Sequence, residues 1–159
     1  MFYKLIEKKR NEWLDSSDCT VRELLRYITT KNRMRDAQIE AIKTYLFLKI
    51  ACGNRPLWEL FVDGVFNDTN IGQVELTETA REIFKTNKAA VALFQYSRLK
   101  DKNGNQLAPE LESYIKRHAD EIDYADVFRK IFYGVDYTDY LFSLPMGAGK
   151  TYLMAAFIY

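Results

Sequence analysis

The chain of 159 residues has a single histidine, two cysteines and a formal net charge of only +1. His118 has no cysteine or acidic residues around it at ligand spacing, which argues against a metal site and against Ser-His-Asp or Cys-His catalysis. Cys19 and Cys52 lie far apart without metal-like spacing, which predicts reduced, buried or half-buried thiols of a cytoplasmic protein. The balanced charge excludes a bulk attraction to nucleic acid but leaves room for a local basic patch.

Long apolar runs are also missing. No run approaches the roughly twenty residues of a membrane span, and the charged segment 1–13 lacks the apolar core of a signal peptide. We therefore expect no membrane contact. The chain has no repeat, low-complexity run or hinge-like linker, and its 48% hydrophobic and 14% aromatic residues are typical of a foldable globular protein.

Most of the chain has apolar residues at helical spacing, which predicts a mainly α fold with five to seven helices. Residues Thr20–Glu23 and Thr79–Glu82 have the form of capping boxes. One short strand is expected near 139–144, where the run is apolar and strand-like. The helices are predicted at 2–14, 20–30, 35–52, 57–62, 78–99, 109–118 and 124–133, with Tyr124, Val127, Phe128, Ile131 and Phe132 of the last one pointing inward.

The C-terminal segment has the parts of a phosphate-binding loop: an apolar run, a glycine turn, Lys-Thr and a helix-like run. Gly147 and Gly149, on either side of Ala148, allow backbone N–H groups to approach phosphate oxygens. Lys150 is expected to reach the β- and γ-phosphates of ATP, and the Thr151 hydroxyl to bind Mg²⁺. The general pattern requires a glycine at 144, where this chain has leucine.

The segment Pro145–Thr151 resembles the first motif of the superfamily-two helicases and translocases, and looks most like that of the motor subunits of type I and type III restriction systems. The resemblance implies a strand, phosphate loop and helix of an incomplete RecA-like α/β lobe. It also implies ATP and Mg²⁺ as cofactors, and nucleic acid, most often DNA, as the partner. The alternative is a chance glycine turn between two core elements.

A second segment supports the resemblance. Arg35–Ile42 matches the Arg-x-x-Gln-x-x-Ala-Ile sequence that many of these motors carry ahead of the phosphate loop. The resemblance implies that Gln38 reads the adenine edge, which an amide can do with a paired donor and acceptor, and that Arg35 lies close to the base or its phosphates. Otherwise Gln38 is a solvated first-turn residue of an ordinary helix.

The distance between the two motifs departs from the family, in which only a few tens of residues separate them. We therefore expect three regions: N-terminal helices over 1–52, a helical insertion over 53–137, and the start of a motor lobe over 138–159. The acidic pair and the second-lobe arginines that hydrolysis requires are not in this sequence, so it contains no complete catalytic set. We expect the N-terminal fragment of a larger motor, which binds nucleotide weakly and does not hydrolyse it.

Two other functions stay open at this point. The chain could be a helical module that binds a partner subunit or a nucleic-acid end, without a nucleotide function of its own. A complete small P-loop kinase or GTP switch is disfavoured, because no second acidic strand follows Thr151.

Three residue groups are weaker candidates for a site, and each also has a plain structural explanation. The acidic group could hold a cation or simply favour a helix N-terminus. The basic group could contact phosphates or form a solvated helix face. The aromatic group could stack on bases or form core. These groups are Asp120, Glu121, Asp123 and Asp126; Arg22, Arg26, Lys31, Arg33 and Arg35; and Tyr96, Tyr114, Tyr124, Phe128, Phe132 and Tyr133.

Overall fold

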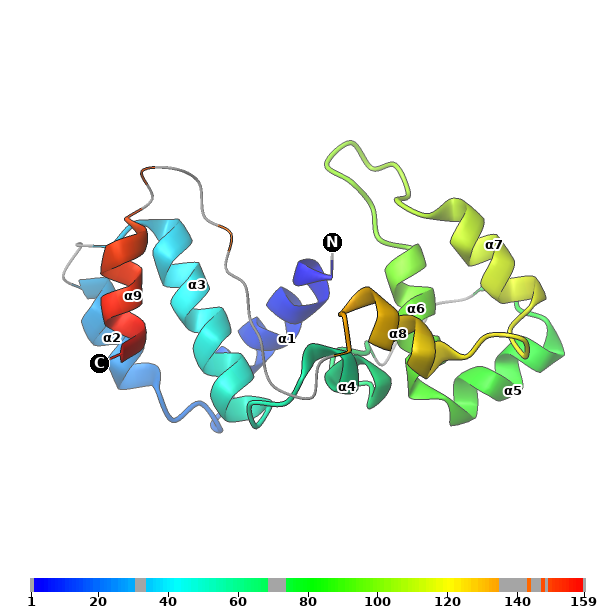
Figure 1. Ribbon diagram of the computed structural model, residues 1–159, viewed down its shortest axis with the longest axis horizontal. Helices are drawn as coiled ribbons and strands as arrows, with labels where there is room; N and C mark the ends of the chain where they lie inside the picture. Colours follow the sequence, from blue (N-terminus) through cyan, green and yellow to red (C-terminus); the bar gives the residue numbers. More distant parts are fainter. Residues whose placement is uncertain are drawn as a thin grey trace. The chain divides into compact units, whose positions relative to one another are not determined.

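The structure, a computed structural model, describes residues 2–30, 34–68, 74–134, 143, 147 and 149–158. Over these residues the fold is mainly helical and has no β-strand, only an isolated antiparallel bridge between Lys100 and Gln106. The elements in Figure 1 are α1 (Tyr3–Asp15), α2 (Arg22–Thr30), α3 (Asp36–Leu46), a π-helical turn η1 (Phe47–Ala51), α4 (Leu57–Val62), α5 (Glu78–Thr86), α6 (Lys88–Ser97), α7 (Pro109–Arg117), α8 (Tyr124–Ile131) and α9 (Lys150–Ile158).

The mainly α prediction is therefore confirmed for the described part of the chain. Pro109 opens α7 as expected, and Asp123 caps α8 by accepting a hydrogen bond from a backbone N–H in its first turn. The helix expected from Lys150 onward is present as α9. The strand expected at 139–144 lies outside the described residues, apart from Ser143.

Residues 78–99 form two helices, so the prediction of one long helix there is wrong. Asn87 separates α5 from α6 because its backbone, at φ −113° and ψ 103°, leaves the helical region. Its side chain then caps α6 by accepting from a backbone N–H of the next turn. The capping box expected to begin at Thr79 is also wrong, since Thr77 caps α5.

The chain divides into two compact units. We call the first the aromatic unit, formed by Met1–Leu5 and Pro56–Tyr137, and the second the loop unit, formed by Ile6–Arg55 and Thr138–Tyr159. The region that the sequence predicts as an insertion, 53–137, falls almost wholly within the aromatic unit. The phosphate-loop residues and the Arg35–Ile42 segment fall within the loop unit.

The core of the aromatic unit is a cluster of phenylalanines from α4 and α8 and from the N-terminus. Phe61 and Phe128 are fully buried, and their rings stack at a centroid distance of 5.3 Å. Phe2 meets Phe61 edge-on at 4.9 Å and stacks on Tyr96 of α6 at 4.1 Å. Buried aromatic rings contribute large apolar areas and additional ring–ring attraction. Ile131, which we expected to point inward, is instead 41% exposed.

The core of the loop unit is aliphatic. Leu25 of α2, Ala41 and Ile42 of α3, and Leu153 of α9 form one buried cluster. Trp13 of α1 lies against Phe47 of η1, with ring centroids 5.8 Å apart. The apolar face of α3 thus packs against both α2 and α9.

The end of η1 follows the stop signal in the sequence. Gly53 and Asn54 adopt left-handed backbone conformations, with φ of 64° and 57°, which terminate the helix. Cys52 and Cys19 are free, buried thiols, as the sequence predicts. Burial raises the pKa of the Cys52 thiol to about 11, although nearby Arg55 opposes this shift.

Candidate phosphate-binding site

The candidate site lies where the first turns of α3 and α9 meet within the loop unit. The two helices run side by side and in the same direction, as Figure 1 shows, so both N-termini are at one end of the pair. Three contacts follow each other from the N-terminal to the C-terminal end of both helices. They are a side-chain hydrogen bond, a shared aliphatic cluster and a pair of aromatic rings with centroids 4.5 Å apart. These pairs are Gln38 with Gly149, Ile42 with Leu153, and Tyr45 with Phe157.

Gly149 begins α9. Its carbonyl oxygen accepts the first helical hydrogen bond, from the Leu153 N–H at 3.2 Å. Gly149 and Gly147 both have left-handed backbones, with φ of 72° and 75°, which residues with a side chain rarely adopt. Apart from its chain neighbours, no atom of the described residues lies within 4 Å of the position that a Cβ on Gly147 would take. The glycine turn that the motif predicts is therefore present at these two residues, while Ala148 lies outside the described part of the chain.

Lys150 and Thr151 are the first two residues of α9, and both are exposed. At this position the backbone N–H groups have no carbonyl partner within the helix and carry the positive end of its dipole. An exposed ammonium group and a hydroxyl beside such N–H groups can contact the oxygens and the metal ion of a bound polyphosphate. The donor set thus fits a phosphate group, and the Thr151 hydroxyl is an oxygen ligand that suits Mg²⁺.

Gln38 has a different environment from the one that its adenine role implies. It is only 3% exposed, and its side chain bonds two backbone groups of the protein. Its Oε1 accepts from the Arg35 N–H at 2.7 Å, and its Nε2 donates to the Gly149 carbonyl oxygen at 2.8 Å. The Arg35 guanidinium donates to the carbonyl oxygen of Gly147. Arg35 and Gln38 therefore contact the two glycines of the predicted phosphate loop.

The first of these bonds is one half of a capping box, with Arg35 at the N-cap of α3 and Gln38 at the third helical position. The other half is missing because the Arg35 side chain has no acceptor, and the Gln38 N–H donates to the Arg35 backbone carbonyl instead. The interpretation of Gln38 as a solvated first-turn residue is wrong, because the side chain is buried. Its spacing from Arg35 agrees with a capping box. An arginine at the N-cap is unusual, so the sequence pattern alone does not reveal the cap.

Positive charge is concentrated at this end of the helix pair. Two parallel helices place two partial positive charges close together, and Arg35 and Lys150 add full ones. Asp36 in the first turn of α3 supplies one opposing carboxylate. A bound anion would relieve the remaining repulsion, which is the electrostatic reason why this end suits phosphate.

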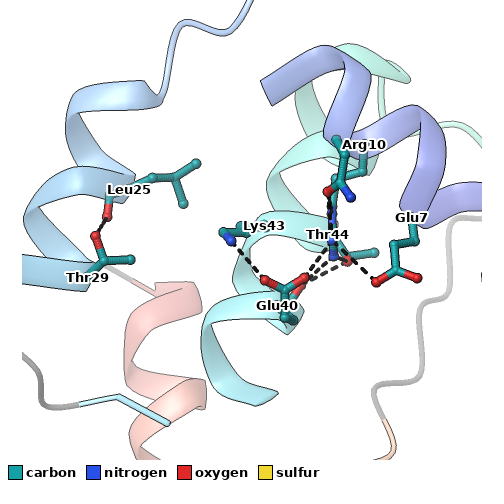
Figure 2. A network of polar contacts seen from close by, with 8 residues as sticks. Glu7, Arg10, Leu25, Thr29, Glu40, Lys43 and Thr44 are labelled. Carbon is teal, nitrogen blue, oxygen red and sulfur yellow. Dashed lines mark hydrogen bonds and ion pairs between the residues drawn. The ribbon is translucent and has the colours of Figure 1, made fainter. Parts of the chain in front are cut away.

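A second polar network fixes α3 against α1, and Figure 2 shows it. Arg10 is 2% exposed, and its guanidinium contacts the Glu40 carboxylate at 2.5 Å and the Thr44 hydroxyl at 2.9 Å. Glu40 also pairs with Lys43 at 2.8 Å. Burial alone raises the pKa of Glu40, but the bonds and charges of Lys43 and Arg10 outweigh it and hold that pKa below its ordinary value. The network fixes the helix that carries Gln38.

Of the basic group, only Arg35 is described at the candidate site, where it donates to the Gly147 carbonyl oxygen. Arg22 bonds the Leu14 and Ser16 carbonyl oxygens, and Arg26 pairs with Glu23 at 3.0 Å. Lys31 and Arg33 lie outside the described part of the chain.

The aromatic and acidic groups are mostly structural. Tyr96, Phe128 and Phe132 belong to the aromatic cluster, and Tyr124 is buried. Tyr114 and Tyr133 are 49% and 89% exposed. The described residues contain no group of three or more His, Cys, Asp or Glu side chains placed to hold a metal ion. His118 stacks on Tyr114 and lies 3.3 Å from the Glu121 carboxylate.

Comparison with known proteins adds no relative, because no family model, curated protein or solved structure matches the chain. Across the residues that the structure describes, none of the helices has the length and apolar character needed to cross a membrane.

Proposed function

We propose that the loop unit is the start of a nucleotide-binding lobe and that residues 147–151 bind the phosphates of ATP. One observation carries this proposal. Two segments that separately resemble the nucleotide-binding motifs of superfamily-two motors contact each other, although Gln38 and Gly149 are 111 positions apart in the sequence. A chance glycine turn has no reason to lie against the Arg35–Ile42 segment rather than elsewhere on the unit.

In this function each residue of the loop has a distinct role. The N–H groups at the start of α9 bind phosphate oxygens, Lys150 neutralises the charge of the β- and γ-phosphates, and the Thr151 hydroxyl binds Mg²⁺. Arg35 lies at the same end of the helix pair and adds positive charge. The larger protein would be an ATP-driven translocase acting on nucleic acid, most consistent with a restriction or related DNA-processing system.

The structure of this chain supports binding rather than turnover. Phosphoryl transfer needs acidic residues that hold the metal ion and position water, together with arginines that stabilise the transition state. Around residues 147–151 the described part of the chain supplies Lys150, Thr151 and Arg35, but no acidic residue in a group that could hold a metal ion. We therefore expect ATP binding without hydrolysis by this chain.

The proposal is tested by thermal unfolding with and without ATP and Mg²⁺. At a ligand concentration five times the Kd, binding stabilises the native state by about 1 kcal/mol, which raises the Tm by about 2–4 °C for a domain of this size. Lys150→Ala should abolish the rise and leave the Tm without ligand unchanged, because the Lys150 side chain is exposed. Lys85→Ala, which removes an exposed lysine of the aromatic unit, should keep the rise.

An equal rise in wild type and Lys150→Ala would exclude Lys150 from the site. No rise in wild type at millimolar ATP would instead favour the other function that the sequence allows, a helical interaction module. In a longer protein that contains this chain, the same Lys150→Ala change should abolish ATP turnover while the fold is retained.

A further inference from the structure

We infer that Gln38 is a positioning residue: it holds the phosphate loop in place, so it supports binding of the triphosphate of any nucleoside and does not read adenine. This inference rests on the proposed function, because it assigns a role within the same site. It differs from the adenine role in what the side chain contacts.

The Gln38 amide is buried and faces two backbone groups of the protein. A glutamine amide has two N–H donors and an oxygen with two lone pairs, and reading adenine requires one donor and the oxygen to face the base together. In the structure the oxygen accepts from the Arg35 N–H and the nitrogen donates to the Gly149 carbonyl. The side chain is 3% exposed, so the amide faces the protein and not a ligand.

Gln38 contacts the phosphate loop at the carbonyl oxygen of Gly149. The Gly149 carbonyl oxygen is the N-cap acceptor of α9, and it receives both the Leu153 N–H and the Gln38 amide. This oxygen fixes where α9 begins, and hence where the first free N–H groups of Lys150 and Thr151 point. Gln38 therefore sets the geometry of the phosphate-binding end of α9 without contacting phosphate.

Gln38 and Gly149 also fit closely together. A Cβ added to Gly149 would lie 2.7 Å from the Gln38 Nε2, whereas the same atom on Gly147 would meet nothing within 4 Å. Gly149 thus has two requirements for glycine, its left-handed φ of 72° and the approach of Gln38. Because the amide occupies the space beside the loop backbone, the two motifs are joined before any nucleotide binds.

The chain offers a matched control for the test. Like Gln38, Gln95 of α6 uses both ends of its amide to bond backbone groups. It donates to the Asp68 carbonyl and accepts from the Asp68 N–H, each at 3.0 Å. It belongs to the aromatic unit. A substitution of Gln95 therefore removes one donated and one accepted amide bond, as a substitution of Gln38 does, without changing the phosphate loop.

The experiment measures binding of inorganic tripolyphosphate, ATP and GTP, each with Mg²⁺, by calorimetry. Gln38→Met keeps the size of the side chain and removes both bonds, and it should weaken binding of all three ligands by the same factor, about five- to tenfold. Gln38→Glu keeps the acceptor, loses the donor and adds a negative charge that repels all three anions, so it should weaken all three by more than Gln38→Met does. Gln95→Met should leave all three affinities unchanged.

A loss confined to ATP in the Gln38 variants, or no loss in either of them, would overturn the inference, and the first outcome would restore the adenine role. Hydrogen exchange separates this failure from that of the proposed function. If wild type binds none of the ligands, the proposed function fails. In that case faster exchange of the Leu153 amide in Gln38→Met would still support the hold of Gln38 on the loop, and unchanged exchange would refute it.

Discussion

The aromatic unit buries an apolar cluster of rings, whereas the loop unit buries an arginine and a glutamine. In the aromatic unit, Phe61 and Phe128 are fully buried and stacked, and the buried Ser97 hydroxyl donates only to a carbonyl of its own helix. In the loop unit, Arg10 and Gln38 are 2% and 3% exposed, and each bonds a different segment of the chain.

The difference shows where geometry has to be fixed. Apolar burial is strong and non-directional, so it stabilises a unit without specifying the position of single atoms. Buried polar groups cost free energy unless they are fully bonded, but their bonds are directional. Three buried polar side chains of the described residues lie in the loop unit, and Arg10 of α1 donates to one of the other two, Thr44 of α3. The third, Gln38 of α3, donates to the carbonyl oxygen of Gly149 at the start of α9. We infer that the loop unit gives up part of its stability to hold the phosphate-binding end in place.

The largest expected effect is in the aromatic unit. Phe61→Ala removes a fully buried ring that contacts Phe2, Phe66 and Phe128, and it should lower the free energy of unfolding by about 3–5 kcal/mol. Chemical denaturation followed by circular dichroism measures this loss. Tyr133→Ala, at a side chain that is 89% exposed, should change it by less than about 0.5 kcal/mol. Similar values for the two variants would contradict the description of the core.

The next effect is in the loop unit. Arg10→Met keeps much of the apolar stem but leaves the Glu40 carboxylate and the Thr44 hydroxyl without their guanidinium partner. We expect a loss of about 2–3 kcal/mol in the same assay, less than for a fully buried pair because Glu40 is 35% exposed. Arg26→Met removes an exposed pair and should cost less than about 0.5 kcal/mol. A loss as small for Arg10→Met would mean that the network is not stabilising.

A smaller effect is expected at the junction of the two motifs. Gly149→Ala combines left-handed strain with displacement of the Gln38 amide, which would lose its bond to the Gly149 carbonyl, and should cost about 2 kcal/mol. Gly53→Ala shares the strain, at φ 64°, but has nothing within 4 Å, so about 1 kcal/mol is expected. Equal costs at the two glycines would show that Gln38 does not press on the loop.

The sequence alone predicted local features well and relations between distant segments incompletely. The first residues of α4, α7 and α8 follow from Pro56, Pro109 and Asp123, whose effects act within one turn. The break at Asn87 was missed because the apolar stripe continues across it, and the polar cap competes with that stripe. Helical spacing also places Ile131 on the apolar side, but its exposure depends on what packs around it.

The candidate site was predicted in part. The motif residues Gly147, Gly149 and Lys150 indicated the turn and the start of α9, because glycine and helix-start signals are local. That Gln38 would bond the Gly149 carbonyl was not predictable from spacing, because no local rule connects residues 111 positions apart. The ion pair between buried Arg10 and partly exposed Glu40 was also missed, because charged residues on a helix normally indicate a solvated face.

The smallest expected effect is a dependence on pH in the loop unit. Glu40 has a lowered pKa in the folded chain, so its ionised form favours folding above the unfolded-state pKa, and this contribution is lost as the pH falls through the folded value. The stability difference between wild type and Glu40→Gln, less than about 1 kcal/mol at pH 7, should therefore shrink between about pH 5 and pH 3. A difference that grows as the pH falls would contradict the assigned direction.

The most direct test of the phosphate site is the response of its backbone amides, followed by nuclear magnetic resonance in the ¹⁵N-labelled chain. We predict that ATP with Mg²⁺ shifts the amide resonances of Gly149, Lys150 and Thr151 in a saturable way. Inorganic tripolyphosphate should shift the same resonances, and Lys150→Ala should weaken the response at least tenfold. Resonances at these three residues that stay in place while others move, or no movement at millimolar ligand, would contradict a phosphate site at the start of α9.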